Sequence, residues 1–182
     1  MLEVEAKAHV SNFENIKIKL KEIGAEENKF EHQEDIYFNA PHKDFAQTDE
    51  ALRIREITRK KSVEIILTYK GAKLDDKSKT RKEIEVKVED KNNLASILEN
   101  IGFKASGKVR KDRINYLFKG FIITLDKVYN LGNFVEIEKD LMEGEDYQKI
   151  LDEIFEIYSK LGIEEGFERR SYLELLEMND PQ

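Results

Sequence analysis

The chain has 182 residues, of which 38% are charged, and its formal net charge at pH 7 is -7. This length suits a single domain over residues 1–182, and the negative balance argues against general nucleic-acid binding, because any phosphate site must be a local group of cations. Because the chain has no cysteine, disulfides, thiolate catalysis and cysteine-built zinc sites are excluded. It also has no apolar run of membrane-spanning length and no secretion signal, so we expect a cytoplasmic protein.

The first predicted element, a strand over residues 2–10, carries its charges on one face. Glu3, Glu5 and Lys7 alternate with apolar residues, and a period of two places them on the same side of a strand. Glu3 and Glu5 would lie roughly 6 to 7 Å apart and repel each other by about 2.5 kcal/mol at an effective dielectric constant near 20. We therefore expect cations close to them.

A helix is predicted next, because apolar residues recur at helical spacing from Phe13 to Ile23 and Gly24 ends the run. Ser11 or Asn12 is the expected N-cap of this helix. Segments with the alternation of strands follow the helix at residues 34–39, 51–58 and 63–69. The first part of the chain is thus predicted as a strand, a helix and three strands.

The same order of strand, helix and strands begins again at residue 80. A strand over residues 80–88 carries Glu83, Glu85 and Lys87 at the spacing found in the first strand, and the helix after it also ends in Ile-Gly. Further strands are predicted at residues 108–118, 121–127 and 133–139, with a tight hairpin turn at Lys119 and Gly120. The similarity of the two halves, about 1–78 and 79–140, indicates a duplication within the domain.

Two C-terminal helices complete the prediction. The longest apolar stripe runs from Tyr147 to Leu161 and stops at Gly162, and a short helix is expected over residues 171–176. Two similar sheets that face each other can close into a barrel, which removes exposed edges. With the charges inward and the apolar residues outward under amphipathic helices, the prediction is an α+β fold: a barrel of about eight strands with a polar, charged lumen.

The charged strand faces allow two interpretations. As the solvated outer side of a sheet they would bind nothing, which is the common case for one isolated strand. As an enclosed lumen they would bind a polyanion and divalent cations, with carboxylates on the metals and Lys or Arg on phosphate oxygens. Because the pattern recurs on six strands, we favour the lumen, and it must hold water, metal or ligand, since dry burial of ions costs several kcal/mol each.

Several short motifs occur in a fixed order along nearly the whole chain. They are Glu3-x-Glu5-x-Lys7, Asp35-Ile36-Tyr37-Phe38 with Pro41, Leu52-Arg53-Ile54-Arg55, Leu67-Thr68-Tyr69-Lys70-Gly71, Arg81-Lys82-Glu83-Ile84-Glu85, Lys111-x-Arg113, Leu125-Asp126-x-Val128 and Gly132-x-Phe134-Val135-Glu136-Ile137-Glu138. In this order they resemble the CYTH superfamily of triphosphate-tunnel enzymes, named for class IV adenylate cyclases and thiamine triphosphatases. The surroundings of Arg53, Lys70 and Gly132 are most similar to the class IV cyclase branch.

The resemblance implies an eight-stranded antiparallel tunnel that binds a triphosphate together with Mg²⁺ or Mn²⁺. Position by position, it implies phosphate binding by Lys7, Arg53, Arg55, Lys70, Arg81, Lys111 and Arg113. It implies metal binding by Glu5, Glu136 and Glu138, with Glu3 and Asp126. Arg170 stands where the family often has Lys, so a phosphate-closing role is expected there and a base role is not.

Three activities fit this reading. In the first, of the class IV cyclase type, the ribose 3′-hydroxyl of ATP attacks the α-phosphorus and pyrophosphate leaves. In the second, a triphosphatase directs water at the γ-phosphorus of thiamine triphosphate, inorganic triphosphate or a nucleoside triphosphate, and Tyr37 with Lys70 could orient or deprotonate that water. In the third, the protein binds triphosphates or polyphosphate without catalysis. The sequence also leaves open whether the chain forms a homodimer through the outer face of its sheet.

Overall fold

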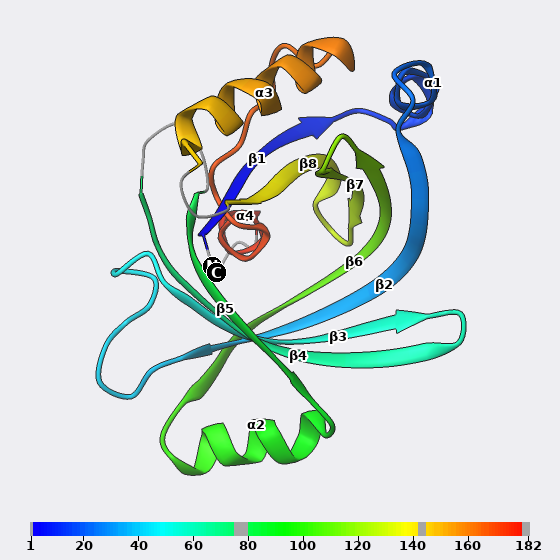
Figure 1. Ribbon diagram of the computed structural model, residues 1–182. Helices are drawn as coiled ribbons and strands as arrows, with labels where there is room; N and C mark the ends of the chain where they lie inside the picture. The colour runs from blue at the N-terminus through cyan, green and yellow to red at the C-terminus, as the bar shows by residue number, and fades with distance from the viewer. Residues whose placement is uncertain (1, 75–79, 142–144, 180–182) are drawn as a thin grey trace.

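The computed structural model describes residues 2–74, 80–141 and 145–179. Its sheet is a closed barrel in the order β1-β5-β4-β3-β2-β6-β7-β8, with antiparallel neighbours throughout (Figure 1). The strands are β1 (Leu2–Val10), β2 (Glu26–Asn39), β3 (Ala51–Arg59), β4 (Ser62–Lys73), β5 (Arg81–Val88), β6 (Lys104–Phe118), β7 (Phe121–Val128) and β8 (Gly132–Leu141). The predicted eight-stranded barrel is confirmed.

Four helices accompany the barrel over the described residues: α1 (Glu14–Glu22), α2 (Lys91–Asn100), α3 (Tyr147–Lys160) and α4 (Tyr172–Asn179). The order of one strand, one helix and three strands occurs twice before α3. Figure 1 shows α3 outside β1 and α2 at the opposite side of the molecule, where it packs on β3 and β6. None of the helices in the described ranges is long and apolar enough to cross a membrane.

The main apolar core lies outside the barrel, between the sheet and α3. Val4, Ala6 and Ala8 point outward from β1 and are buried against α3 side chains that include Ile154. The hydroxyl of the buried Tyr158 lies 2.7 Å from the carbonyl oxygen of Ala6, so the polar end of this core residue has a partner. Each fully buried Ile or Val contributes about 1.5 to 3 kcal/mol. On this side, helices cover the apolar face of the barrel as predicted.

The helices do not cover the whole outer face. Ile84 and Val86 point outward from β5, yet 52% and 54% of their surfaces remain exposed, so the expectation that helices bury them is wrong. The reason is the position of α2, which packs on β3 and β6 through Leu98 and leaves its own Ile97 and Ile101 exposed. An apolar strip therefore stays open along β5.

Two predicted boundaries also need correction. Neither Ser11 nor Asn12 is the N-cap of α1, because the Asn12 side chain accepts from the backbone N–H of Glu14 in a turn and the helix begins after Phe13. β2 begins at Glu26 and not at residue 34. The sequence did not indicate this, because Phe30 is the one apolar residue of its first half and no apolar alternation arises there. The predicted hairpin turn is present, with φ of 50° at Lys119 and 83° at Gly120.

Candidate functional site

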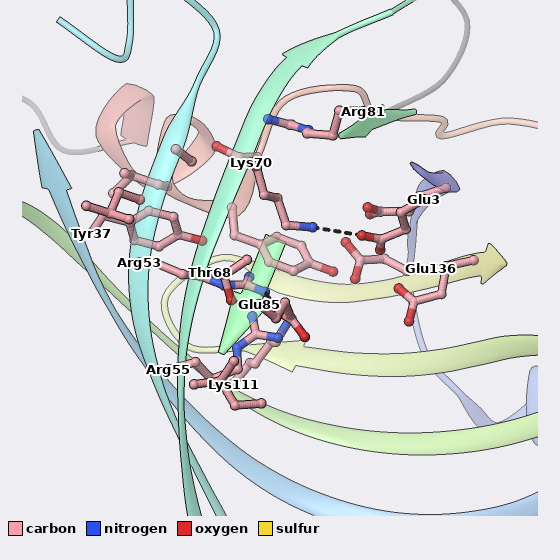
Figure 2. A pocket seen from close by; sticks show the side chains of 18 of the residues that line it. Glu3, Tyr37, Arg53, Arg55, Thr68, Lys70, Arg81, Glu85, Lys111 and Glu136 are labelled. Atoms are coloured by element: carbon pink, nitrogen blue, oxygen red, sulfur yellow. Dashed lines mark hydrogen bonds and ion pairs between the residues drawn. The ribbon is translucent and has the colours of Figure 1, made fainter. Parts of the chain in front are cut away.

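The lumen of the barrel holds a cavity of about 550 Å³ that charged side chains line. In Figure 2, Arg53, Arg55 and Lys111 reach it from one side, and Glu3 and Glu136 face them from the other. The register explains this arrangement, since residues that stand opposite each other on paired strands point to the same face of the sheet. Apart from Lys87 at the end of β5, which is 80% exposed, the alternating charges therefore point inward, and the interpretation as a solvated outer face is wrong.

Three of the five predicted metal-binding acids form one cluster. One carboxylate oxygen from each of Glu3, Glu5 and Glu138 lies within 4.8 Å of the others, and Glu5 stands opposite Glu138 in the β1–β8 register. Burial, together with the charge of Glu3, raises the pKa of Glu138 well above its usual range. Carboxylate oxygens are the ligands that Mg²⁺ and Mn²⁺ prefer, and a bound cation would offset this repulsion, so the cluster fits a divalent metal.

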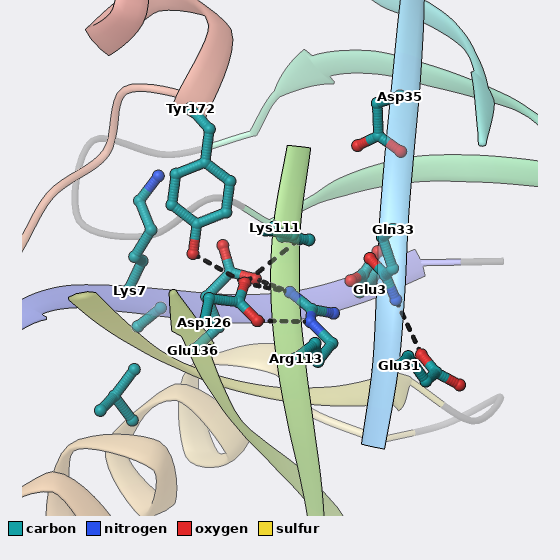
Figure 3. Close-up of polar contacts among 12 residues, drawn as sticks. Glu3, Lys7, Glu31, Gln33, Asp35, Lys111, Arg113, Asp126, Glu136 and Tyr172 are labelled. Atoms are coloured by element: carbon teal, nitrogen blue, oxygen red, sulfur yellow. Dashed lines mark hydrogen bonds and ion pairs between the residues drawn. The ribbon is translucent and has the colours of Figure 1, made fainter. Parts of the chain in front are cut away.

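The other two predicted metal ligands, Asp126 and Glu136, are held by Arg113. The guanidinium of Arg113 contacts both oxygens of Asp126 at 2.6 and 2.5 Å and reaches Glu136 Oε2 at 2.5 Å (Figure 3). Lys111 Nζ lies 3.1 Å from the same Asp126. Burial disfavours the charge of Asp126, but Arg113 and Lys111 outweigh it and hold the pKa of this carboxyl below its usual value. The structure thus separates the acids into a cluster of three and a pair bound by a cation.

The predicted phosphate-binding cations differ in how firmly acids hold them. Arg55 makes a bidentate pair with Asp35, with both distances at 2.7 Å. Arg53 approaches Asp35, Glu83 and Glu85 only to between 3.7 and 3.9 Å. Its buried Nε has no hydrogen-bond partner among the described residues. Arg53 therefore has the donor capacity that an incoming anion needs.

Lys70 and Tyr37, the predicted catalytic pair, both line the cavity. Lys70 Nζ lies 2.6 Å from Glu83 and 3.2 Å from Glu3, and these acids outweigh burial and raise the pKa of its ammonium. Tyr37 stands opposite Arg53 in the register and belongs to the same buried cluster as Tyr172. Lys70 in this setting keeps its proton, which suits phosphate binding better than the uptake of a proton from water.

The remaining predicted cations lie at the edges of the site. Arg81 lines the cavity and is only 6% exposed. Lys7 is buried, and its Nζ donates to the backbone carbonyl of Arg170 at 2.5 Å. The guanidinium of Arg170 instead pairs with Glu168 on the surface, where 46% of the side chain is exposed. Of the predicted cations, all but Lys7 and Arg170 line the cavity.

Tyr172 enters the lumen although no strand pattern pointed to it. It is the first residue of α4, and Ser171 and Glu174 cap this end reciprocally through their side chains. The Tyr172 hydroxyl donates to Asp126 at 2.9 Å, and its ring lies 4.1 Å from Lys7 Nζ (Figure 3). The helix that carries it lies against β6 at a glycine, Gly107, where a Cβ would come within 2.4 Å of Leu173.

Sequence reasoning also missed Glu31 and Gln33, which are 2% exposed on the inner face of β2. The Gln33 amide donates to Glu31 at 2.7 Å, and Glu31 accepts from Arg59 at the same distance. A usable signal existed, because Glu31, Gln33 and Asp35 continue the period of two toward Tyr37. The charged lining thus extends further along β2 than the motifs indicated.

Comparisons with known proteins agree with this geometry. The family model for the CYTH domain matches residues 1–172. A Methanocaldococcus jannaschii protein named "Putative adenylate cyclase" is 42% identical over 176 residues, which cover 96% of this chain and 98% of that protein. A solved Pyrococcus horikoshii structure is 45% identical with a TM-score of 0.90, covering 98% of this chain and 99% of that one. A Hippeastrum protein described as a "putative adenylyl cyclase" with a dominant triphosphatase activity shares the fold at 17% identity and a TM-score of 0.70, covering 100% of this chain and 97% of that one.

Proposed function

The chain belongs to the CYTH domain family, and on this premise we propose that it is a divalent-metal-dependent enzyme that processes a triphosphate inside the barrel. One observation carries the proposal: the acid cluster of Glu3, Glu5 and Glu138 and the cations Arg53 and Lys70 face the same cavity. A triphosphate with its metal presents the complementary charges in the same order, anionic oxygens beside a cation. A cysteine-free chain also suits the cytoplasm, where we expect the enzyme to act.

We propose the class IV cyclase reaction on ATP as the activity. A bond forms between the ribose 3′-oxygen and the α-phosphorus, the bond from that phosphorus to the pyrophosphate oxygen breaks, and the 3′-hydroxyl proton leaves to solvent. Mg²⁺ or Mn²⁺, when bound, activates the attacking oxygen and neutralises charge on the leaving group. The relative that is 42% identical carries an adenylate cyclase name, which supports this choice over other triphosphate reactions.

In this proposal the acidic and the basic side chains of the lumen have different roles. Glu3, Glu5 and Glu138 hold the metal, and the lumen cations contact phosphate oxygens and stabilise the negative charge that develops as pyrophosphate leaves. These cations are Lys7, Arg53, Arg55, Lys70, Arg81, Lys111 and Arg113. Asp126 and Glu136 orient Arg113 through their short contacts. Because the barrel fixes these groups before substrate binds, little reorganisation is needed during the reaction.

The test is to incubate purified protein with ATP and Mn²⁺ and to separate the products. We expect cyclic AMP and pyrophosphate in equal amounts. Orthophosphate without a cyclic product would overturn the cyclase proposal and support a triphosphatase, whose water nucleophile needs the same charged lumen. A panel of ATP, GTP, thiamine triphosphate and tripolyphosphate would then identify the substrate, and binding without any turnover would leave a triphosphate-binding protein.

Tyr37→Phe tests whether the tyrosine hydroxyl takes part in hydrolysis. If Tyr37 orients the attacking water, the variant should lose about 10- to 100-fold in kcat for phosphate release, while its KM stays within about twofold, because the ring still packs in place. Steady-state kinetics with tripolyphosphate and with ATP provide the measurement. Unchanged kcat would assign Tyr37 to packing alone. Tyr147→Phe, at the exposed start of α3, is the matched control.

A further inference from the structure

The lining of the cavity changes from charged to apolar along four strands. Each of these strands has charged residues at one end of its inner face and an aliphatic residue at the other. The inward residues are Arg53, Arg55 and Ile57 on β3, Lys70, Thr68 and Ile66 on β4, Lys111, Arg113, Asn115 and Leu117 on β6, and Asp126, Thr124 and Ile122 on β7. The four aliphatic residues all line the cavity, and none of them belongs to an apolar core cluster of the described residues.

The four aliphatic residues lie at one end of the barrel. β3 and β6 both pair antiparallel with β2, so they run in the same direction and the turns that follow them lie at the same end. Ile57 and Ile66 lie near the β3–β4 turn, and Leu117 stands opposite Ile122 beside the β6–β7 turn. Leu117 and Ile122 are 44% and 36% exposed. This end of the lining therefore offers apolar surface to a molecule that enters the cavity.

The acid cluster borders on both parts of the lining. Glu3 contacts Lys70 at 3.2 Å, and Glu138 stands opposite Ile122 in the β7–β8 register. Cations thus lie on one side of the cluster and an aliphatic pair lies on the other. A ligand that matches this order has a polyanionic part, a bound metal and an uncharged part. Inorganic triphosphate has no uncharged part that could cover the aliphatic surface.

Polar groups beside the aliphatic pair have hydrogen-bonding capacity left. Asn115 is 6% exposed and lines the cavity, and its Nδ2 donates to the carbonyl of Lys29 at 3.3 Å, which leaves the amide oxygen as an acceptor. The buried Thr124 Oγ1, opposite Asn115 in the register, has no hydrogen-bond partner among the described residues. A nucleobase has apolar faces and a polar edge, so it can cover the aliphatic side chains and pair with these groups.

We propose that this end of the cavity binds the base of a nucleoside triphosphate, and that Leu117, Ile122 and Asn115 select this substrate over inorganic triphosphate. The assignment rests on the proposed function and deepens it, because it sets the direction of the substrate. The outer phosphates lie beside Arg53 and Lys70, the metal lies at the acid cluster, and the base lies toward the β6–β7 turn. In this direction the α-phosphorus, which is next to the nucleoside, lies near the metal, as the cyclase reaction requires.

Leu117→Ser tests the base subsite, since this exposed side chain can be shortened without a cavity in the core. Calorimetric titration in Mn²⁺ compares two ligands: α,β-methylene ATP, from which pyrophosphate cannot leave, and tripolyphosphate, which has no base. We expect the variant to bind the ATP analogue about 10-fold more weakly, because an apolar contact is lost, and to bind tripolyphosphate within about twofold of the wild type. Ile18→Ser on the exposed face of α1 is the matched control and should leave both affinities unchanged.

The outcomes separate the base subsite from the reaction. Equal weakening of both ligands, unchanged binding of the ATP analogue, or a wild type that binds tripolyphosphate alone would overturn the subsite. Selective weakening of the analogue, together with no cyclic AMP from ATP, would support the subsite and overturn the cyclase reaction. A wild type that binds neither ligand would overturn both proposals.

Discussion

Replacing Glu138 with Gln should reduce metal-dependent turnover by about 100-fold or more, since it removes a ligand charge from the site where the metal stabilises the transition state. Glutamine keeps the size of the side chain, so a loss of activity would reflect the charge and not the packing. Glu138 is also the acid whose pKa is raised most clearly by burial and by Glu3. Steady-state rates across a Mn²⁺ titration provide the measurement, and Glu156→Gln on the exposed face of α3 is the control.

Glu138→Gln should lower turnover, but it should not lower the stability of the metal-free fold. Because Glu138 stands close to two other carboxylates, its replacement by Gln relieves repulsion, and the metal-free variant should unfold at the same temperature as the wild type or above it. The wild type should gain stability when Mn²⁺ is added, and the variant should gain less. An equal metal-induced shift in unfolding temperature for both proteins would show that the cluster does not bind the metal.

Asp35→Asn should destabilise the fold by about 3 to 5 kcal/mol at pH 7, because it leaves the buried guanidinium of Arg55 without the carboxylate that pairs with it. Asp35 is 2% exposed, so water cannot replace the lost partner. The measurement is the free energy of unfolding from urea titration. Asp152→Asn on the exposed face of α3 is the control and should change stability by less than about 0.5 kcal/mol.

The effect of Asp35→Asn should depend on pH. Burial disfavours the charge of Asp35, but Arg55 outweighs it and holds the pKa of this carboxyl below its usual value. A pKa that is lower in the folded state means that the stabilising contribution is complete above the unfolded pKa, near 3.9, and is lost as the pH falls through the folded value. The difference between wild type and variant should thus stay constant above about pH 5 and shrink below about pH 4. A difference that grows in acid would contradict this assignment.

Much of the site follows from one local rule. The period of two in the charges of β1, β5 and β8 predicted which side chains face inward, because the geometry of a strand decides this without help from the rest of the chain. The apolar stripe from Tyr147 to Leu161 likewise predicted α3 and its covering role. The alternating segments predicted about eight strands, the family resemblance implied that they are antiparallel, and the structure confirms a closed antiparallel barrel.

Other features depend on how distant segments meet. The sequence could not separate Asp126 and Glu136, which Arg113 holds, from the cluster around Glu5, because only the register between strands decides which acid meets which cation. Tyr172 reaches Asp126 from 46 residues away. It does so because α4 docks beside β6, and no alternation within a strand records that contact. The first half of β2 escaped detection because it holds a single apolar residue, Phe30, and so shows no apolar alternation.

The position of the apolar core outside the barrel has a consequence for molecular evolution. Substitutions beneath α3 can be tolerated singly when they conserve volume, since they exchange one apolar side chain for another. A lumen residue such as Asp35 or Arg113 cannot be exchanged so freely, because its loss leaves a buried charge of the opposite sign without its partner. Changes of ligand preference in this barrel should therefore require paired substitutions that keep the buried charges balanced. Aligned homologues should show Asp35 covarying with Arg55, whereas residues of the outer core should vary independently of one another.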